Sequence, residues 1–126
     1  MNTILIADDD IVTRKLIKTV CENLGYKVIE CDNGQAALKA IKRRRVHILI
    51  TDWIMPKLDG LTLCEEVRKK SGHPLFVFLL TGKKKGLNNY TQAMKAGAND
   101  FIYKPVDYFV IRNQLQIAER ELAMAN

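Results

Sequence analysis

Short apolar runs alternate five times with longer stretches in which apolar residues recur at helical spacing. The runs predict five strands, at Thr3–Ala7, Lys27–Cys31, His47–Thr51, Leu75–Leu80 and Phe101–Tyr103. Apolar residues spaced three or four apart predict a helix after each strand, as in the stripe from Leu16 to Leu24 that Gly25 closes. Strict alternation of strand and helix predicts an α/β fold, a parallel sheet with helices on both faces.

The starts of several helices can be read from side chains that accept hydrogen bonds from the first turn. Asp10, Asp59 and Asp107 each precede a helical pattern and are expected to cap it. Asn33-Gly34 is expected to form a turn before a second helix around Ala36–Ile41.

Polar side chains with complementary chemistry follow four of the expected strands. They are Asp8, Asp9 and Asp10 after the first strand, Asp52 after the third, Thr81 after the fourth and Lys104 after the fifth. Ligands of open parallel sheets bind at the carboxyl ends of the strands, so these side chains are expected to converge. Taken singly, each has a simple structural explanation as a cap, a turn residue or a surface charge. The inference depends on their combination.

The expected cluster suits phosphoryl transfer assisted by a metal. Neighbouring carboxylates repel one another unless a cation lies between them, and Mg²⁺ prefers one or two carboxylates together with a phosphate. A carboxylate can also attack phosphorus, while a lysine and a hydroxyl neutralise the charge of the transferred group.

Composition narrows the class of protein. The chain has 126 residues, 48% of them hydrophobic, which is typical of one globular domain, and no apolar run is long enough for a membrane span. The N-terminus lacks the basic region of a secretion signal. Three widely spaced cysteines favour neither a disulfide framework nor a zinc site, so a cytoplasmic location is expected.

The net charge is +6, and the positive charge is spread out, with basic residues in Lys39–Arg45 and again in Lys83–Lys85. A solvated face is the default interpretation of such runs. No nucleic-acid-binding motif accompanies them, so nucleic acid is not an expected partner of this domain, and an acidic protein surface is the better candidate for Lys83–Lys85. Another alternative is a flavodoxin-like binder of a small molecule. That class needs a glycine loop after the first strand, where this chain has Asp8–Asp10.

Five motifs carry a resemblance that spans the whole chain. They are IADD at 6–9, DWIMPKLDG at 52–60, LTG at 80–82, AGANDF at 96–101 and KP at 104–105. The chain resembles the receiver domains of two-component response regulators, including the chemotaxis response regulator. The resemblance implies a doubly wound, flavodoxin-like sheet of five parallel strands in the order 2-1-3-4-5.

The resemblance also implies a role for each motif residue. Asp52 would be the phosphorylated residue. Mg²⁺ would be held by Asp8, Asp9, Asp52 and the backbone carbonyl of Ile54. Thr81 and Phe101 would be the switch residues, with Thr81 and Lys104 binding the phosphoryl group, and the bond before Pro105 would be cis.

The implied function is a phosphorelay switch that promotes only its own phosphorylation and dephosphorylation and is otherwise not an enzyme. Its partner would be a histidine kinase or a phosphotransfer protein, and its output surface the fourth helix, fifth strand and fifth helix. Ile54 and Lys83 should flank the phosphate, and we hypothesise that Ile54 hinders the water that would hydrolyse it.

The domain organisation has two interpretations. The helix-forming stretch QLQIAERELAM at 114–124 shows no stop signal and resembles receivers that precede diguanylate cyclase or phosphatase output domains. Residues 1–126 would then be one receiver domain cut from a longer protein. The other interpretation is a single-domain receiver. A homodimer is compatible with both.

Overall fold

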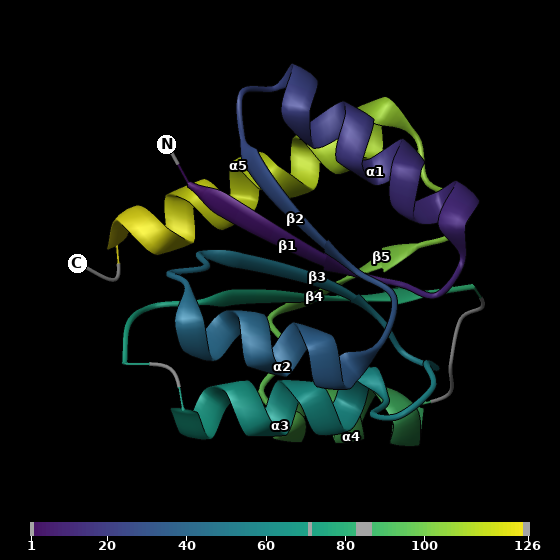
Figure 1. Ribbon diagram of the computed structural model, residues 1–126, viewed down its shortest axis with the longest axis vertical. Helices are drawn as coiled ribbons and strands as arrows, with labels where there is room; N and C mark the ends of the chain where they lie inside the picture. The colour runs from purple at the N-terminus through teal and green to yellow at the C-terminus, as the bar shows by residue number, and fades with distance from the viewer. Residues whose placement is uncertain (1, 71, 83–86, 125–126) are drawn as a thin grey trace.

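The computed structural model describes residues 2–70, 72–82 and 87–124 and contains five strands and five helices in alternation (Figure 1). In chain order these are β1 (Thr3–Ala7), α1 (Ile11–Asn23), β2 (Lys27–Cys31), α2 (Gly34–Arg43), β3 (Ile48–Asp52), α3 (Gly60–Lys70), β4 (Phe76–Thr81), α4 (Leu87–Ala96), β5 (Asp100–Tyr103) and α5 (Tyr108–Met124). The strands form one parallel sheet in the order β2-β1-β3-β4-β5, which confirms the predicted fold class and strand order.

The sheet is the middle of three layers. Helices α1 and α5 cover one face, and α2, α3 and α4 cover the other (Figure 1). Each face has its own apolar core: Ile50 and Phe78 belong to the cluster under α1 and α5, whereas Leu49 and Val77 belong to the cluster under the other three helices. Because successive strand residues point to opposite faces, these two cores determine the register of the central strands.

The central strands are apolar without a break because both of their faces are covered. Every residue of β4 is buried, and so are Ile48–Thr51 of β3. This is the expected pattern for parallel strands between two helical layers. Of the helices the structure describes, none is both long enough and apolar enough to cross a membrane.

The helix starts follow the expected caps with one exception. The side chains of Asp10, Asp59 and Asp107 accept hydrogen bonds from backbone N–H groups of the first turns of α1, α3 and α5, at 3.2, 2.8 and 2.9 Å. The prediction of a turn at Asn33-Gly34 was wrong. Asn33 is itself a cap, accepting a bond of 2.9 Å from the Ala36 N–H, so α2 already begins at Gly34.

A glycine brings the start of α3 against the end of β3. A Cβ atom on Gly60 would lie 2.1 Å from the backbone oxygen of Asp52, closer than any side chain allows. The N–H of Gly60 donates to the carbonyl of Trp53 at 2.8 Å. The loop that leaves β3 is therefore held tightly where Asp52 emerges.

We expect Gly60→Ala to lower the free energy of unfolding by at least about 2 kcal/mol, because the new methyl group must displace the Asp52 backbone. Gly72→Ala is the matched control, since a Cβ there would meet nothing within 4 Å, and it should change stability by no more than about 0.5 kcal/mol. Urea unfolding followed by circular dichroism measures both. Equal effects of the two substitutions would show that the close approach at Gly60 is unimportant.

Candidate functional site

Asp8 lies at the carboxyl end of β1 and is completely buried. Its N–H donates to the carbonyl of Cys31 at 3.1 Å, which extends the pairing of β1 with β2 by one residue. One carboxylate oxygen, Oδ1, accepts the N–H of Asp10 at 2.9 Å, and the guanidinium of Arg14 donates to the Asp8 carbonyl at 2.7 Å. Among the residues that the structure describes, Oδ2 accepts no hydrogen bond.

Asp52 is the last residue of β3, beside β1 in the sheet, and its side chain is 15% exposed. Its Oδ1 accepts the N–H of Trp53 at 2.9 Å, which orients the carboxylate. The adjacent order of β1 and β3 thus places Asp52 next to the acids that follow β1.

Three carboxylates meet at this edge. One oxygen from each of Asp8, Asp9 and Asp52 lies within 4.8 Å of the others. Asp8 is buried, Asp52 is half-buried and Asp9 is exposed, so the group opens toward solvent on one side. An all-oxygen donor set and a buried Asp8 oxygen that accepts no hydrogen bond fit a hard divalent cation that keeps some of its water.

Lys104 is the cation that the chain itself supplies. Its Nζ lies 3.4 Å from Oδ2 of Asp8 and 3.4 Å from Oδ2 of Asp52. Both distances exceed the roughly 2.7–2.9 Å of a close charge-assisted hydrogen bond, so the ammonium is shared loosely between the two acids. The Lys104 N–H donates to the Thr81 carbonyl at 2.8 Å, and the bond to Pro105 is cis.

Electrostatics at the site are strongly coupled. Burial, and then the charge of Asp8, raise the pKa of Asp52 to about 6, although Lys104 and the Trp53 N–H act in the opposite direction. Burial lowers the pKa of Lys104, but the charges of Asp52 and Asp8 outweigh it and leave that pKa above its usual value. With three carboxylates and one lysine, the site has an excess of negative charge.

Thr81 and Phe101 lie beside the carboxylates on the next two strands. Thr81 is the last residue of β4 and follows Leu80, the pairing partner of Asp52. Its side chain is 3% exposed, and it lines a small pocket with Tyr90, Phe101 and Tyr103. The Phe101 ring is buried, whereas Tyr103, two residues along β5, is 47% exposed.

The tertiary structure adds neighbours that the motifs did not single out. The ring of Trp53 stacks on Phe101 at a centroid distance of 6.3 Å, and Tyr90 of α4 approaches Phe101 at 5.5 Å. Arg14 also joins the site through the Asp8 carbonyl. Since these contacts join separate elements, sequence spacing held no signal for them. Of the expected flanking residues, Ile54 is 72% exposed and Lys83 lies outside the described residues.

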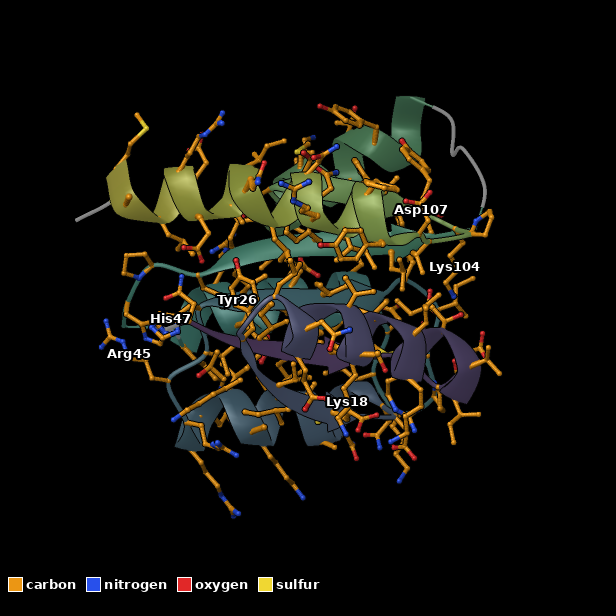
Figure 2. The ribbon with its side chains drawn as sticks, turned by 90° about the horizontal axis from the view of Figure 1, so that it is seen from above. Lys18, Tyr26, Arg45, His47, Lys104 and Asp107 are labelled. Carbon is orange, nitrogen blue, oxygen red and sulfur yellow. The ribbon has the colours of Figure 1, made fainter. Side chains whose placement is uncertain are left out.

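The edge that holds the site lies at one end of the molecule (Figure 2). Figure 2 shows Lys104 and Asp107 at one end of the molecule and Arg45 and His47 at the other. Both histidines belong to this second end: the ring of His47 accepts the Thr3 N–H at 3.1 Å, and Nε2 of His73 lies 2.7 Å from the Val46 carbonyl. Neither histidine lies among the strand-end side chains of the site.

Comparison with known proteins gives a consistent result. The family model for the response regulator receiver domain matches residues 4–116. The probable transcriptional regulator ycf27 of Cyanidium caldarium is 34% identical over 98% of this chain, but the chain spans only 48% of that regulator. Chemotaxis protein CheY1 of Helicobacter pylori is 32% identical over 90% of this chain and 94% of its own length. The receiver domain of the Francisella response regulator 1452 superposes with a TM-score of 0.85 at 27% identity, covering 96% of this chain and 98% of that one.

The raised pKa of Asp52 predicts how stability depends on pH without divalent cations. The folded protein holds the Asp52 proton up to about pH 6, whereas the unfolded chain releases it near 3.8. Ionisation of Asp52 therefore costs stability as pH rises from about 4 through 6, and the cost is complete above 6. Asp52→Asn should be more stable than the wild type at pH 7.5, by about 1 kcal/mol after solvent screening, or roughly 3–5 °C in Tm.

Thermal unfolding in EDTA at pH 7.5 and at pH 4 measures this difference, which should be nearly absent at pH 4. Asp59→Asn is the control, because an exposed capping aspartate replaced by asparagine keeps its capping oxygen. A gain in Asp52→Asn that is the same at both pH values would contradict the electrostatic origin.

Proposed function

This chain belongs to the response-regulator receiver family of two-component signalling, and we propose that it accepts a phosphoryl group on Asp52 from a histidine kinase or a phosphotransfer protein. We place this reaction in the cytoplasm, as for other response regulators. The observation that supports the proposal best is the convergence of Asp8, Asp9, Asp52 and Lys104 at one sheet edge. Receiver domains are signalling domains, so the chemistry would be limited to adding and removing the chain's own phosphoryl group.

Asp8, Asp9 and Asp52, with the backbone carbonyl of Ile54, would hold Mg²⁺. Once bound, the ion would offset the excess negative charge and help to neutralise the incoming phosphoryl oxygens. The donor chemistry fits, because three carboxylates share the edge and the buried Asp8 Oδ2 accepts no hydrogen bond from the described residues.

Asp52, Lys104 and Thr81 would each have a separate role in the phosphoryl transfer. An oxygen of Asp52 attacks phosphorus, the new O–P bond forms, and the P–N bond of the donor phosphohistidine breaks with its electron pair leaving on the imidazole. Lys104, already beside Asp52, pairs with a phosphoryl oxygen, and the hydroxyl of Thr81 donates to another.

Signal output would use the surface of α4, β5 and α5. Thr81, Tyr90 and Phe101 line one pocket, so a movement of the Thr81 hydroxyl toward the phosphoryl group changes the space available to the Phe101 ring. Phe101 also accepts a hydrogen bond of 2.7 Å at its carbonyl from Gln114 of α5. These contacts join the phosphorylation site to the helices on both sides of β5, which is how a local charge change can alter a distant surface.

We propose that residues 1–126 form one receiver domain. The relatives show two arrangements in which such a domain can occur, within a longer regulator or alone. The ycf27 regulator is about twice as long as this chain, whereas CheY1 is nearly the same length. If this chain is part of a longer regulator, an output domain after α5 or a second copy of the chain would receive the signal. If it is a single-domain receiver, a separate effector would receive it.

Incubation with Mg²⁺ and acetyl phosphate should add one phosphoryl group to the wild-type chain, detected by intact-protein mass spectrometry. Asp52→Asn should abolish the modification because it removes the nucleophile. Asp59→Asn, at an exposed cap on the same edge, should be modified like the wild type. Phosphorylation that persists in Asp52→Asn, or is unaffected by EDTA, would refute the assignment.

The exposed side chain of Ile54 lies two residues after Asp52 and is expected to hinder the hydrolytic water. Ile54→Asn should speed autodephosphorylation by about tenfold, equivalent to about 1.4 kcal/mol of activation free energy, because a polar side chain can hold that water. Ile54→Val keeps an apolar branched group and should stay within about twofold. The decay of phosphorylated protein after removal of the donor gives the rates, and equal rates in wild type and Ile54→Asn would contradict the hypothesis.

A further inference from the structure

The amino edge of the sheet, opposite the phosphorylation site, carries a concentrated basic surface. It is formed by two segments far apart in sequence, the end of α2 with the connection to β3, and the end of α3 with the connection to β4. They meet around one shallow pocket, and we call its lining residues Lys42, Arg43, Arg44, Arg45, Lys70 and His73 the amino-edge basic surface. The lysines and arginines of this surface are all exposed.

Ordinary structural roles account for only part of this charge. Lys42 and Arg43 occupy the last turn of α2, and Lys70 that of α3, where cations favour the negative end of the helix dipole. Arg44 and Arg45 lie beyond the helix, and Arg44 already has extended backbone dihedral angles. In the described part of the chain, neither arginine has a carboxylate within ion-pair distance.

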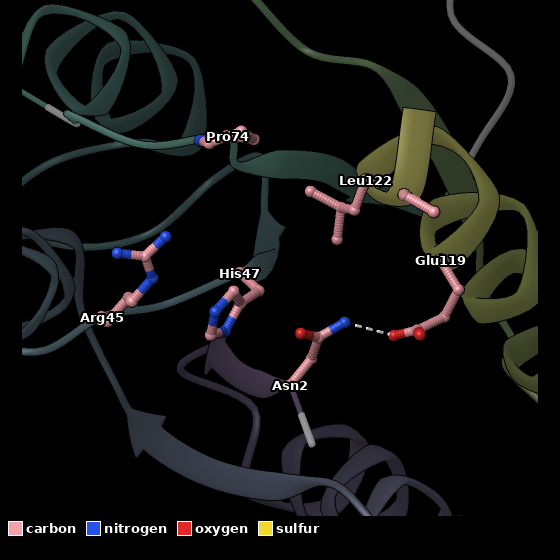
Figure 3. A pocket seen from close by; sticks show the side chains of 7 residues that line it. Asn2, Arg45, His47, Pro74, Glu119 and Leu122 are labelled. Atoms are coloured by element: carbon pink, nitrogen blue, oxygen red, sulfur yellow. Dashed lines mark hydrogen bonds between the residues drawn. The ribbon is translucent and has the colours of Figure 1, made fainter. Parts of the chain in front are cut away.

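The acidic residues lie mostly elsewhere. Every aspartate except Asp100 ends a strand, follows one or precedes a helix at the carboxyl edge, where the phosphorylation site is. Figure 3 shows Glu119 across a second pocket from Arg45 and His47. The Glu119 carboxylate accepts hydrogen bonds from the side-chain amide of Asn2 and, at 3.2 Å, from the hydroxyl of Tyr26. This carboxylate is therefore committed to holding α5 against β1 and β2.

The sequence shows no nucleic-acid-binding motif and therefore predicts no such partner. From the clustering of the basic side chains around one pocket we nevertheless infer that the amino-edge basic surface binds the phosphate backbone of duplex nucleic acid without reading its sequence. Guanidinium groups pair with phosphate oxygens in a bidentate way, and a backbone-tracking surface needs only cations and hydrogen-bond donors. The inference is independent of the phosphoryl chemistry at Asp52, which lies at the opposite edge.

The surroundings favour this ligand over the other polyanions. Hot spots of protein interfaces are enriched in aromatic residues as well as arginine, amphipathic membrane-binding helices bury an apolar face, and single strands need aromatic rings for stacking. Over the described residues of segments 39–45 and 68–74, no large hydrophobic side chain is exposed. The exposed apolar residues lie on other elements, such as Ile11 and Val12 of α1 and Phe109 of α5. Charge without an apolar anchor is the character of a duplex-backbone contact.

The test uses the full chain and a labelled DNA duplex of random sequence, with fluorescence anisotropy recorded between about 50 and 200 mM salt. Arg44→Gln with Arg45→Gln should weaken binding by about tenfold or more at low salt. It should also reduce the slope of log K against log salt by about 1.8, the value for two lost phosphate contacts. Arg112→Gln with Arg120→Gln removes the same charge from exposed positions of α5 and should stay within about twofold of the wild type.

Competition identifies the class of ligand. Unlabelled duplex should displace the probe, whereas vesicles of phosphatidylglycerol and phosphatidylcholine, or polyglutamate at equal charge, should displace it poorly. Absence of binding at low salt would overturn the inference, as would equal losses in the two double variants. Stronger displacement by the vesicles or by polyglutamate would assign the surface to a membrane or to an acidic protein instead. Matching circular dichroism spectra and Tm values would show that all variants are folded.

Discussion

The repulsion between two buried carboxylates, with one lysine between them, is the interaction on which this site depends. Asp8 is completely buried, the side chain of Asp52 is 15% exposed, and Nζ of Lys104 lies 3.4 Å from an oxygen of each. One ammonium cannot neutralise both acids and the exposed Asp9 beside them. The edge therefore favours a bound cation. A divalent cation would offset the excess negative charge, and it would be needed all the more once a phosphoryl group, itself negative, was added.

Burial of apolar side chains in the two cores offsets the unfavourable free energy of placing these carboxylates close together. Side chains of β3 and β4 alternate between the core under α1 and α5 and the core under the other helices, which fixes the register of the strands. Asp52, the last residue of β3, therefore lies level with Leu80, one residue before β4 ends at Thr81. Gly60 then lets α3 start directly against the Asp52 backbone. Burial of apolar side chains thus places repelling charges where they could not otherwise remain.

The two edges of the sheet differ because helix ends and strand ends alternate in a parallel fold. Helix N-termini and strand carboxyl ends share one edge, where aspartates serve as caps and as members of the site. Helix C-termini share the other edge with the lysines and arginines of α2 and α3. Capping explains the aspartates at helix starts, and the helix dipole favours the cations in the last turns of α2 and α3, but neither explains the additional Arg44 and Arg45. The two additional arginines make the amino edge more basic than the helix ends require.

The sequence by itself determined the elements and their order, because hydrophobic periodicity reports which faces are buried. It also determined that acids, a hydroxyl and a lysine follow strands at one edge, since a parallel sheet brings those ends together. At Asn33-Gly34 the sequence predicted a turn, but the same residue types also suit a helix cap, and in the structure Asn33 caps α2 through the Ala36 N–H.

The tertiary structure alone decided the contacts between elements. The loose sharing of Lys104 between Asp8 and Asp52, the stacking of Trp53 on Phe101 and the meeting of the α2 and α3 ends around one basic pocket join residues that are far apart in the chain. Sequence patterns are local, whereas such distances result from how whole helices pack on the sheet.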